Sequence, residues 1–208
     1  MKIGIMGGTF NPIHNTHLEI GKAAKEQFDL DVVMFMPSGK PGYKSNTEIV
    51  SKKHRLKMTE LAVSEALGGK DKGYLVSDFE LKKRGNTYTC ITLKELKKQY
   101  PNDEFYFIIG GDSLYYFYVW KNPDEISKMA VILCAARLGS HDDELNECAK
   151  RYKNDYGTDV RFIEYKSNSL SSTEIRHSTD IEKCVPKSVF NYIKDNGLYS
   201  FKKTRSRQ

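Results

Sequence analysis

Short apolar runs alternate with helical patterns along almost the whole chain. Six segments rich in Val, Ile and Phe are nearly continuous in hydrophobicity: 2–6, 32–36, 74–76, 105–109, 130–134 and 160–163. Strands of this kind are typical of a parallel sheet, because helices bury both of its faces. The alternation predicts an α/β protein with a Rossmann-like, open and mainly parallel sheet, flanked by helices and joined by right-handed crossovers.

Residues 18–28, 54–67, 92–100 and 144–156 have the spacing of amphipathic helices. In the first of them, one side of the helical wheel gathers Leu18, Ala23, Ala24, Gln27 and Phe28. In the second, the predicted buried face consists of Leu56, Met58, Leu61, Ala62 and Leu67. A small C-terminal helical segment is expected at 185–193, with Pro186 in its first turn and Asn196-Gly197 capping its end.

We expect one domain over residues 1–200 and a basic, disordered tail over 201–208. The formal net charge is +6, which could indicate a nucleic-acid binder. The tail supplies four of these charges through Lys202, Lys203, Arg205 and Arg207, so the other 200 residues carry only +2. This distribution and the lack of a nucleic-acid-binding motif argue against a nucleic-acid partner.

The composition also predicts the cellular location of the protein. No apolar run approaches the roughly 20 residues of a membrane span, and the N-terminus has the pattern of a buried strand instead of a signal peptide. The four cysteines show no C-x-x-C pair, which excludes zinc-ribbon spacing. We expect four free thiols, a cytoplasmic location and no membrane partner.

The most informative motif follows the first predicted strand, where Gly7-Gly8 leads into a helix. Ligands of open α/β sheets bind outside the carboxyl ends of the strands. Gly7 and Gly8 would let the backbone approach a phosphate, and the helix start adds partial positive charge. His14 and His17, three residues apart, would share one helix face and point at the same phosphate chain.

The glycines and the two histidines of this motif have other possible interpretations. The G-x-x-x-x-G-K-[ST] pattern of a P-loop and the G-x-G-x-x-G pattern of dinucleotide-binding sheets are both absent. The two histidines could be a capping pair on the surface or half of a zinc site. Their place directly after a strand and a Gly-Gly turn favours anion binding.

A second anion site is predicted at residues 171–176. Ser171 and Glu174 fit a capping box, which marks a helix start. The backbone N–H groups there, the hydroxyls of Ser171, Ser172 and Thr173, and Arg176 one turn later would converge on an anion. A well-capped helix without a ligand is the alternative. Two such helix starts, at opposite ends of one sheet, suggest a polyphosphate held between them.

Together these motifs resemble those of the nucleotidyltransferase superfamily, and more closely those of the bacterial nicotinate-nucleotide adenylyltransferase family. Supporting stretches run in order through nearly the whole chain: 36–41, 80–89, 107–114, 120–126, 135–137 and 196–199. The resemblance implies transfer of AMP from ATP to the 5′-phosphate of nicotinate mononucleotide, with Mg²⁺ carried by the ATP phosphates and not by a protein metal site. The implied partners are these two small molecules; self-association into a homo-oligomer stays open.

The resemblance also implies roles for single residues. It makes His14, His17 and Arg176 catalytic. For ATP binding it implies Gly7, Gly8, Thr9, Phe10, Gly110, Asp112, Ser171, Ser172 and Thr173. For binding of nicotinate mononucleotide it implies Asn11, Lys44, Thr87, Tyr88 and Trp120, with the indole stacked on the pyridine ring. Asp112 could also be a helix N-cap. Residues 115–118 are expected to serve packing, and 38–46 to form a lid.

The chain departs from the family pattern at four positions: Thr16 and Gly111 replace Gly and Ala, Tyr43 replaces a lid histidine, and Ile91 replaces Asp. Other acceptors, nicotinamide mononucleotide or phosphopantetheine, remain alternatives, although Thr87, Tyr88 and Trp120 favour the nicotinate form. A non-catalytic nucleotide-binding regulator is a further class, against which the intact His14, His17 and Arg176 argue.

Overall fold

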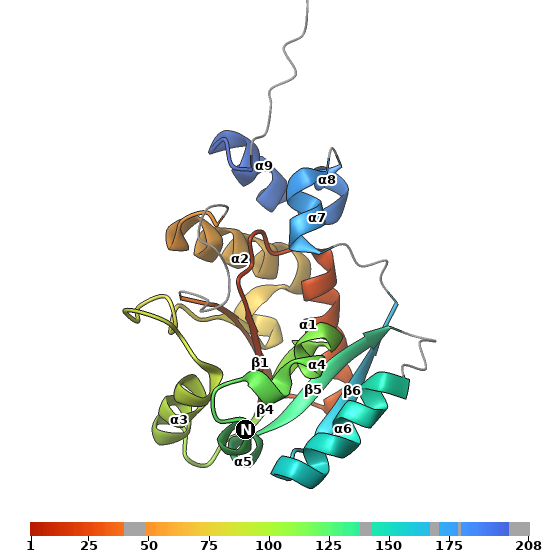
Figure 1. Cartoon of the computed structure of the whole chain (residues 1–208). Helices are drawn as coiled ribbons and strands as arrows, with labels where there is room; N and C mark the ends of the chain where they lie inside the picture. The colour runs from red at the N-terminus through yellow and green to blue at the C-terminus, as the bar shows by residue number, and fades with distance from the viewer. Residues whose placement is uncertain (40–48, 138–142, 167–170, 179, 200–208) are drawn as a thin grey trace, which may run out of the picture.

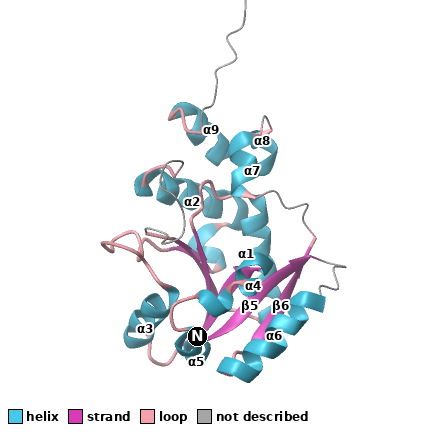
Figure 2. Cartoon of the chain, viewed as in Figure 1, coloured by secondary structure: helices cyan, strands magenta, loops and turns pink. Residues whose placement is uncertain are grey.

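The computed structural model describes residues 1–39, 49–137, 143–166, 171–178 and 180–199. All six predicted strands are present in this part of the chain, and all pair in parallel. They are β1 (Lys2–Gly8), β2 (Val32–Pro37), β3 (Tyr74–Val76), β4 (Glu104–Gly110), β5 (Ala130–Arg137) and β6 (Val160–Tyr165). The order β3-β2-β1-β4-β5-β6 is that of a doubly wound Rossmann-like sheet, which confirms the predicted fold class (Figure 2).

The predicted helices also form, and shorter ones accompany them. The long helices are α1 (Asn15–Phe28), α2 (Lys52–Leu67), α3 (Thr89–Gln99) and α6 (Asp143–Tyr156). The shorter ones are η2 (Gly69–Lys72), α4 (Gly111–Tyr115), η3 (Phe117–Val119), α5 (Pro123–Met129), α7 (Ser172–His177), α8 (Ile181–Cys184) and α9 (Lys187–Asp195). Most of the expected lid, residues 40–46, lies outside the described residues. The whole of the tail after residue 200 also lies outside them.

Alternating side chains of the strands build a separate core on each face of the sheet. In β1, Met6 packs on the face covered by α1, α2 and the C-terminal helices, whereas Ile3 and Ile5 pack on the face covered by α3, α5 and α6. Successive residues of a strand point to opposite faces, so a fully covered sheet needs apolar residues at every position. This explains why the six runs are continuous and not alternating.

The predicted buried face of α2 is partly wrong. Met58, Ala62 and Leu67 are buried as expected, but Leu56 and Leu61 are only half-buried. The side chain that enters the protein in place of Leu56 is the neighbouring Arg55, 1% exposed. An apolar helical wheel cannot identify this face, because the residue that orients it is charged.

Gln27 of α1 is exposed, contrary to its predicted place on the buried face. Its side-chain nitrogen donates to the carbonyl oxygen of Glu164 at 2.7 Å, and its side-chain oxygen accepts from the Glu164 backbone N–H at 3.0 Å. Gln27 thereby satisfies backbone groups on the free edge of β6, where another chain could otherwise pair.

The C-terminal helical segment lies at one end of the molecule, with α7, α8 and α9 together above α2 and the start of α1 (Figure 1). Glu65 of α2 fixes α9, since its carboxylate accepts from the backbone N–H groups of Lys187 at 3.0 Å and Ser188 at 2.7 Å. Ser188, through its hydroxyl and then its backbone N–H, lowers the pKa of Glu65, and the Lys187 N–H adds to this effect. Pro186 is the N-cap of α9 and precedes its first turn, whereas Asn196 caps the C-terminal end as predicted.

Candidate functional site at the carboxyl ends of the strands

The site is built where the two central strands end. Gly8, the last residue of β1, is in register with Pro37 of β2, and β4 ends beside them at Gly110. The loop 9–14 then leads to α1. Because this edge of a parallel sheet faces helix N-termini, it is the place where an anionic ligand of this fold binds.

The structure brings His14 and His17 together. Their ring centroids are 3.7 Å apart and the ring planes are inclined by 32°. His14 is the N-cap of α1, with extended backbone, and His17 is the third helical residue. The two rings therefore share a site as predicted, although His14 lies at the helix start and not within the helix.

The His14 ring is uncharged at neutral pH. The residue is 5% exposed, and burial lowers its pKa to about 4. Its Nδ1 is buried and has no hydrogen-bond partner in the part of the chain that the structure describes. His14 can therefore act on a phosphate through hydrogen bonding but not as a fixed positive charge.

His17 has a defined tautomer. Its Nδ1 accepts a hydrogen bond from the backbone N–H of His14 at 3.3 Å. A ring nitrogen that accepts carries no proton, so the proton of the ring is on Nε2, which makes Nε2 a donor. The helix cap thus sets the direction in which His17 donates.

Gly7 and Gly8, at the end of β1, make room for aromatic rings. A Cβ on Gly8 would lie 2.8 Å from Cε1 of Phe10, and one on Gly7 would lie 3.2 Å from Cζ of Phe107. Phe10 is 2% exposed, has a left-handed φ of 47° and meets the His17 ring edge to face at 5.0 Å. Phe10 therefore supports His17 from the core, and only its backbone can face a ligand.

Helix α7 docks directly on this loop. Ser172 Oγ donates to the carbonyl oxygen of Pro12 at 3.0 Å, and Arg176 Nη1 donates to that of Asn11 at 3.0 Å. The capping box is confirmed, since Ser171 Oγ accepts from the Glu174 N–H at 3.2 Å and the Glu174 carboxylate accepts from the Ser171 N–H at 2.6 Å.

The sequence suggested that the two helix starts lie at opposite ends of the sheet. The structure shows that this expectation is wrong. β1 is central, and the chain returns from the edge strand β6 to place α7 beside the loop. The predicted anion sites are therefore neighbours, and the residues brought together are His14, His17, Ser172, Thr173 and Arg176.

Asn11 connects this loop to two distant segments of the chain through hydrogen bonds. It is 3% exposed, and its Oδ1 accepts from the backbone N–H of Val50 at 3.2 Å and from the Tyr199 hydroxyl at 3.0 Å. Burial raises the pKa of Tyr199, which keeps the phenol protonated as a donor. Asn11 thus holds the loop to the chain before α2 and to the C-terminus; its contact with an acceptor nucleotide stays a prediction.

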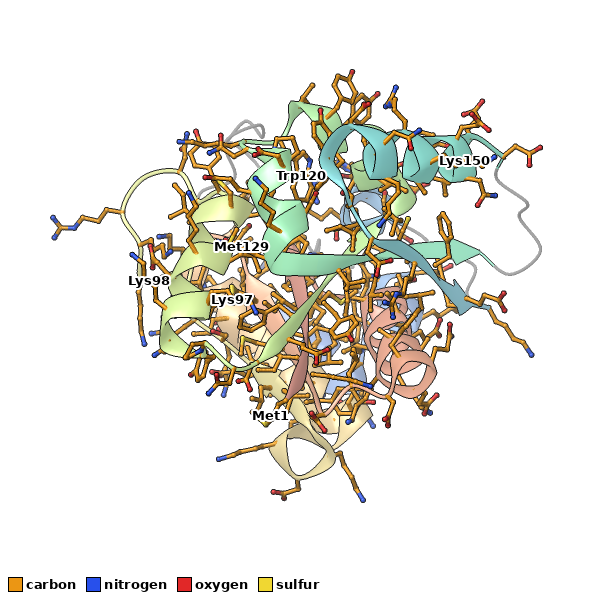
Figure 3. The ribbon with its side chains drawn as sticks, turned by 90° about the horizontal axis from the view of Figure 1, so that it is seen from below. Met1, Lys97, Lys98, Trp120, Met129 and Lys150 are labelled. Carbon is orange, nitrogen blue, oxygen red and sulfur yellow. The ribbon has the colours of Figure 1, made fainter. Side chains whose placement is uncertain are left out.

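Two of the predicted acceptor residues, Thr87 and Tyr88, lie directly before α3. Tyr88 is its N-cap, and the Lys121 ammonium lies 4.6 Å from the centre of the Tyr88 ring. Trp120, between η3 and α5, is half-buried (Figure 3). Its ring centroid is 6.1 Å from that of Phe107. The Phe107 ring is also the group that a Cβ on Gly7 would meet, so Phe107 contacts both Trp120 and the end of β1. Lys44 is outside the described residues.

The segment after β4 corrects two expectations. Gly110, not Asp112, is the N-cap of α4, and Asp112 is exposed in the first turn. Of the aromatic residues expected to serve packing, Phe117 is fully buried, but Tyr116 and Tyr118 are 62% and 51% exposed.

Sequence reasoning missed Arg55 and the end of β2. Arg55 donates to the carbonyl oxygens of Thr9 and Ser38, and Ser38 also donates its backbone N–H to Gly8 at 2.8 Å. The available signal was an arginine spaced three, four and seven residues from Met58, Thr59 and Ala62, on one face of the helix.

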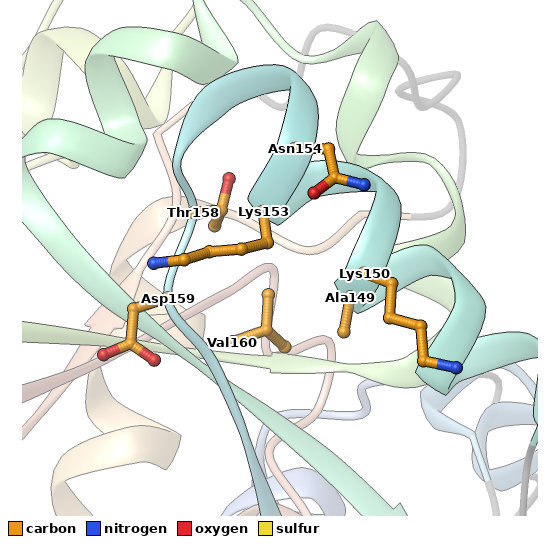
Figure 4. Close-up of a pocket in the computed structure, with 7 residues that line it drawn as sticks. All are labelled: Ala149, Lys150, Lys153, Asn154, Thr158, Asp159 and Val160. Atoms are coloured by element: carbon orange, nitrogen blue, oxygen red, sulfur yellow. The ribbon is translucent and has the colours of Figure 1, made fainter.

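Other features are not part of this site. A hollow of about 430 Å³ between α6 and the start of β6 is lined by Lys150, Lys153 and Asp159, but lies at the amino end of β6 (Figure 4). Within the described ranges, no group of three or more His, Cys, Asp or Glu residues could hold a metal, and no helix is long and apolar enough to cross a membrane. None of the four cysteines forms a disulfide, in agreement with the expected thiols.

The strand order and the joined helix starts define a nucleotidyltransferase of Rossmann-like fold, and residues 5–178 match the family described as Cytidylyltransferase-like. The chain is 39% identical to the "Probable nicotinate-nucleotide adenylyltransferase" of Lachnoclostridium phytofermentans, over 95% of this chain and 98% of the relative. It is 36% identical to the protein of the same name from Clostridium tetani, over 95% and 98%. The chain belongs to the nicotinate-nucleotide adenylyltransferase family, which confirms the resemblance.

Solved structures agree on the fold. The nicotinic acid mononucleotide adenylyltransferase of Plasmodium falciparum, complexed with NaAD, superposes with a TM-score of 0.78 at 20% identity, over 96% of this chain and 98% of that chain. The same protein complexed with APC gives 0.76 at 19% identity, again over 96% and 98%.

Proposed function

We propose that the protein transfers AMP from ATP to the 5′-phosphate of nicotinate mononucleotide, giving deamido-NAD and pyrophosphate in NAD biosynthesis. Membership of the nicotinate-nucleotide adenylyltransferase family supports this reaction. The observation that carries it is the direct hydrogen bond from Ser172 to Pro12, because this contact unites two phosphate-binding helix starts in one site.

The reaction is a direct in-line displacement. An oxygen of the acceptor's 5′-phosphate attacks the α-phosphorus of ATP, a new P–O bond forms, and the bond to the β-phosphate oxygen breaks as pyrophosphate leaves. Since the acceptor phosphate is already a nucleophile, no Ser or Cys nucleophile and no general base is required. The protein contributes alignment of two anions and stabilisation of the charge that develops on the leaving group.

His17 donates from Nε2 to the α-phosphate region, with its direction fixed by the bond from His14 N–H to Nδ1. The uncharged His14 adds a hydrogen bond to the triphosphate. Thr9, Gly7, Gly8 and the Phe10 backbone line the triphosphate, while Gly110 and Asp112 at the end of β4 contact the adenosine part.

Arg176 and the α7 start, at Ser171, Ser172 and Thr173, hold the β- and γ-phosphates, and Lys44 assists. A divalent cation, Mg²⁺ in this proposal, enters as part of the substrate on the ATP phosphates. Cytoplasmic location and self-association remain predictions from the sequence.

The acceptor's nicotinate carboxylate binds the backbone N–H groups near Thr87 and Tyr88. The N-terminus of α3, an eleven-residue helix, carries partial positive charge there, and the Lys121 ammonium is close to Tyr88. Both favour a carboxylate over the uncharged amide of nicotinamide mononucleotide. Trp120 stacks on the pyridine ring, held from behind by Phe107 and Phe117.

An acceptor panel tests the function. Purified protein with Mg-ATP is given nicotinate mononucleotide, nicotinamide mononucleotide or phosphopantetheine, and pyrophosphate release is measured. The expected order places nicotinate mononucleotide first. A preference for the amide or for phosphopantetheine, or no turnover with any acceptor, contradicts the proposal. With ATP chirally labelled at the α-phosphorus, inversion supports a single displacement and retention indicates a covalent intermediate.

A further inference from the structure

Arg55 of α2 is a fully buried guanidinium that binds the backbone of two separate segments. Nη1 donates to the carbonyl oxygen of Thr9 at 2.7 Å, and Nη2 donates to those of Ser38 at 2.8 Å and Gly39 at 3.2 Å. Thr9 belongs to the phosphate loop after β1, whereas Ser38 and Gly39 follow β2. One side chain therefore holds the ends of two adjacent strands.

Packing alone does not account for a charged side chain at this buried position. Burial lowers the pKa of Arg55, and among the described residues its buried Nε has no hydrogen-bond partner. Within the described residues Arg55 forms no ion pair with a carboxylate, and its hydrogen-bond partners there are backbone carbonyl oxygens. Burying a charge without an oppositely charged partner is unfavourable unless hydrogen bonds compensate for the lost hydration.

Gly39, whose carbonyl oxygen accepts from Arg55, lies close to residues on the acceptor side of the site. A Cβ on Gly39 would lie 2.6 Å from the carbonyl oxygen of Glu80 and 2.9 Å from Cγ2 of Thr87. Glu80 is in turn fixed to α3, since its carboxylate accepts from the Thr92 hydroxyl at 2.8 Å. Contacts thus run from Thr9 through Arg55 and Gly39 to Thr87.

We propose that Arg55 is a positioning residue, which sets the distance between the ATP side and the acceptor side of the site. The inference rests on the proposed function, because it concerns the alignment of the two substrates. In-line attack needs the reacting atoms about 3–3.5 Å apart, and a shift of about 1 Å can reduce the rate by about 10². A planar guanidinium can hold two loops at once, which a lysine ammonium on a flexible stem cannot reproduce.

The test compares Arg55→Lys and Arg55→Met with the wild type. Steady-state kcat, thermal unfolding, and separate equilibrium binding of ATP and of nicotinate mononucleotide are measured. We expect kcat of Arg55→Lys to fall by about 10-fold to 10², while each dissociation constant changes by less than about threefold. Lys57→Met is the matched control, since it removes an exposed cation from the same helix and should leave kcat unchanged.

A second variant covers the case in which the Arg55 variants do not fold. Gly39→Ala keeps the guanidinium but pushes against the Glu80 carbonyl, so it should lower kcat with ATP affinity unchanged. If Arg55→Lys and Gly39→Ala break the same link, the loss in the double variant is smaller than the product of the two single losses.

Several outcomes overturn the inference: a folded Arg55→Lys variant with wild-type kcat, a loss confined to stability, or Gly39→Ala with normal kcat. The same holds if one substrate's affinity alone accounts for the loss. Absence of turnover in the wild type is a different result, because it contradicts the proposed function and not the role of Arg55.

Discussion

The rings of His14 and His17 lie with their centroids 3.7 Å apart, yet they differ in environment: His14 is buried at the helix cap, and His17 is half-buried one turn inside. Two imidazolium ions at this distance would repel each other. The structure avoids the repulsion by burying His14 in its neutral form, which leaves His17 to be oriented by the helix cap.

Replacement of His17 by Ala should lower kcat by about 10² or more, the loss expected for one transition-state donor. Pyrophosphate release with Mg-ATP and nicotinate mononucleotide measures it. Glu19→Ala, an exposed change in the same helix, is the control. A His17→Ala enzyme with near-normal kcat would remove His17 from the reaction.

The buried His14 makes folding stability dependent on pH. Its native pKa of about 4 lies below the ordinary value of 6.5, so between these values the unfolded chain binds one more proton. Stability should therefore fall by up to about 1.4 kcal/mol per pH unit as the pH drops through this window. Urea unfolding of the wild type and of His14→Asn, between about pH 7 and 4.5, measures the difference.

In this comparison His14→Asn should lose less stability on acidification than the wild type, whatever its stability at neutral pH. Replacement of the exposed His177 by Asn is the control and should retain the wild-type slope. Equal slopes for His14→Asn and the wild type would show that His14 is protonated in the folded protein.

Two glycines at neighbouring strand ends should respond differently to alanine. In Gly8→Ala the new Cβ meets the Phe10 ring at 2.8 Å, whereas at Gly110 no atom lies within 4 Å. We expect Gly8→Ala to reduce the free energy of unfolding by about 1–3 kcal/mol through overpacking, and Gly110→Ala to change it by less than about 0.5 kcal/mol. Denaturant unfolding separates the two; equal effects would contradict the packing argument.

Glu65→Gln should loosen α9 from α2, because a neutral amide oxygen accepts the Lys187 and Ser188 N–H groups less strongly than a carboxylate. Ser188, through its hydroxyl and backbone N–H, and the Lys187 N–H lower the pKa of Glu65, so the stabilisation is present above about pH 4.5 and is lost as the pH falls through the native pKa. Hydrogen exchange of α9 should be faster in the variant at neutral pH, with the difference shrinking in acid.

Glu60→Gln is the control for this change, since Glu60 lies on the same helix and pairs with Lys57 at 3.8 Å. It should leave α9 protected. Unchanged exchange in Glu65→Gln at neutral pH would show that apolar contacts, such as those of Val189 and Ile193, hold α9 alone.

The sequence by itself determined the strands, the long helices and the local capping of the helix starts. Continuous apolar runs predicted a doubly covered parallel sheet, and the capping box at Ser171 and Glu174 formed as written, because these features depend on neighbours in the chain. The spacing of His14 and His17 likewise predicted that their rings would lie close together.

Only the tertiary structure decided what depends on residues far apart in the chain. It placed β1 centrally and α7 beside its loop, and it brought Tyr199 to Asn11 across 188 positions. It also buried Arg55 in place of Leu56 and neutralised His14. Burial and long-range hydrogen bonds set these outcomes, because a side chain's charge and partners depend on its surroundings in the folded molecule and not on helical periodicity.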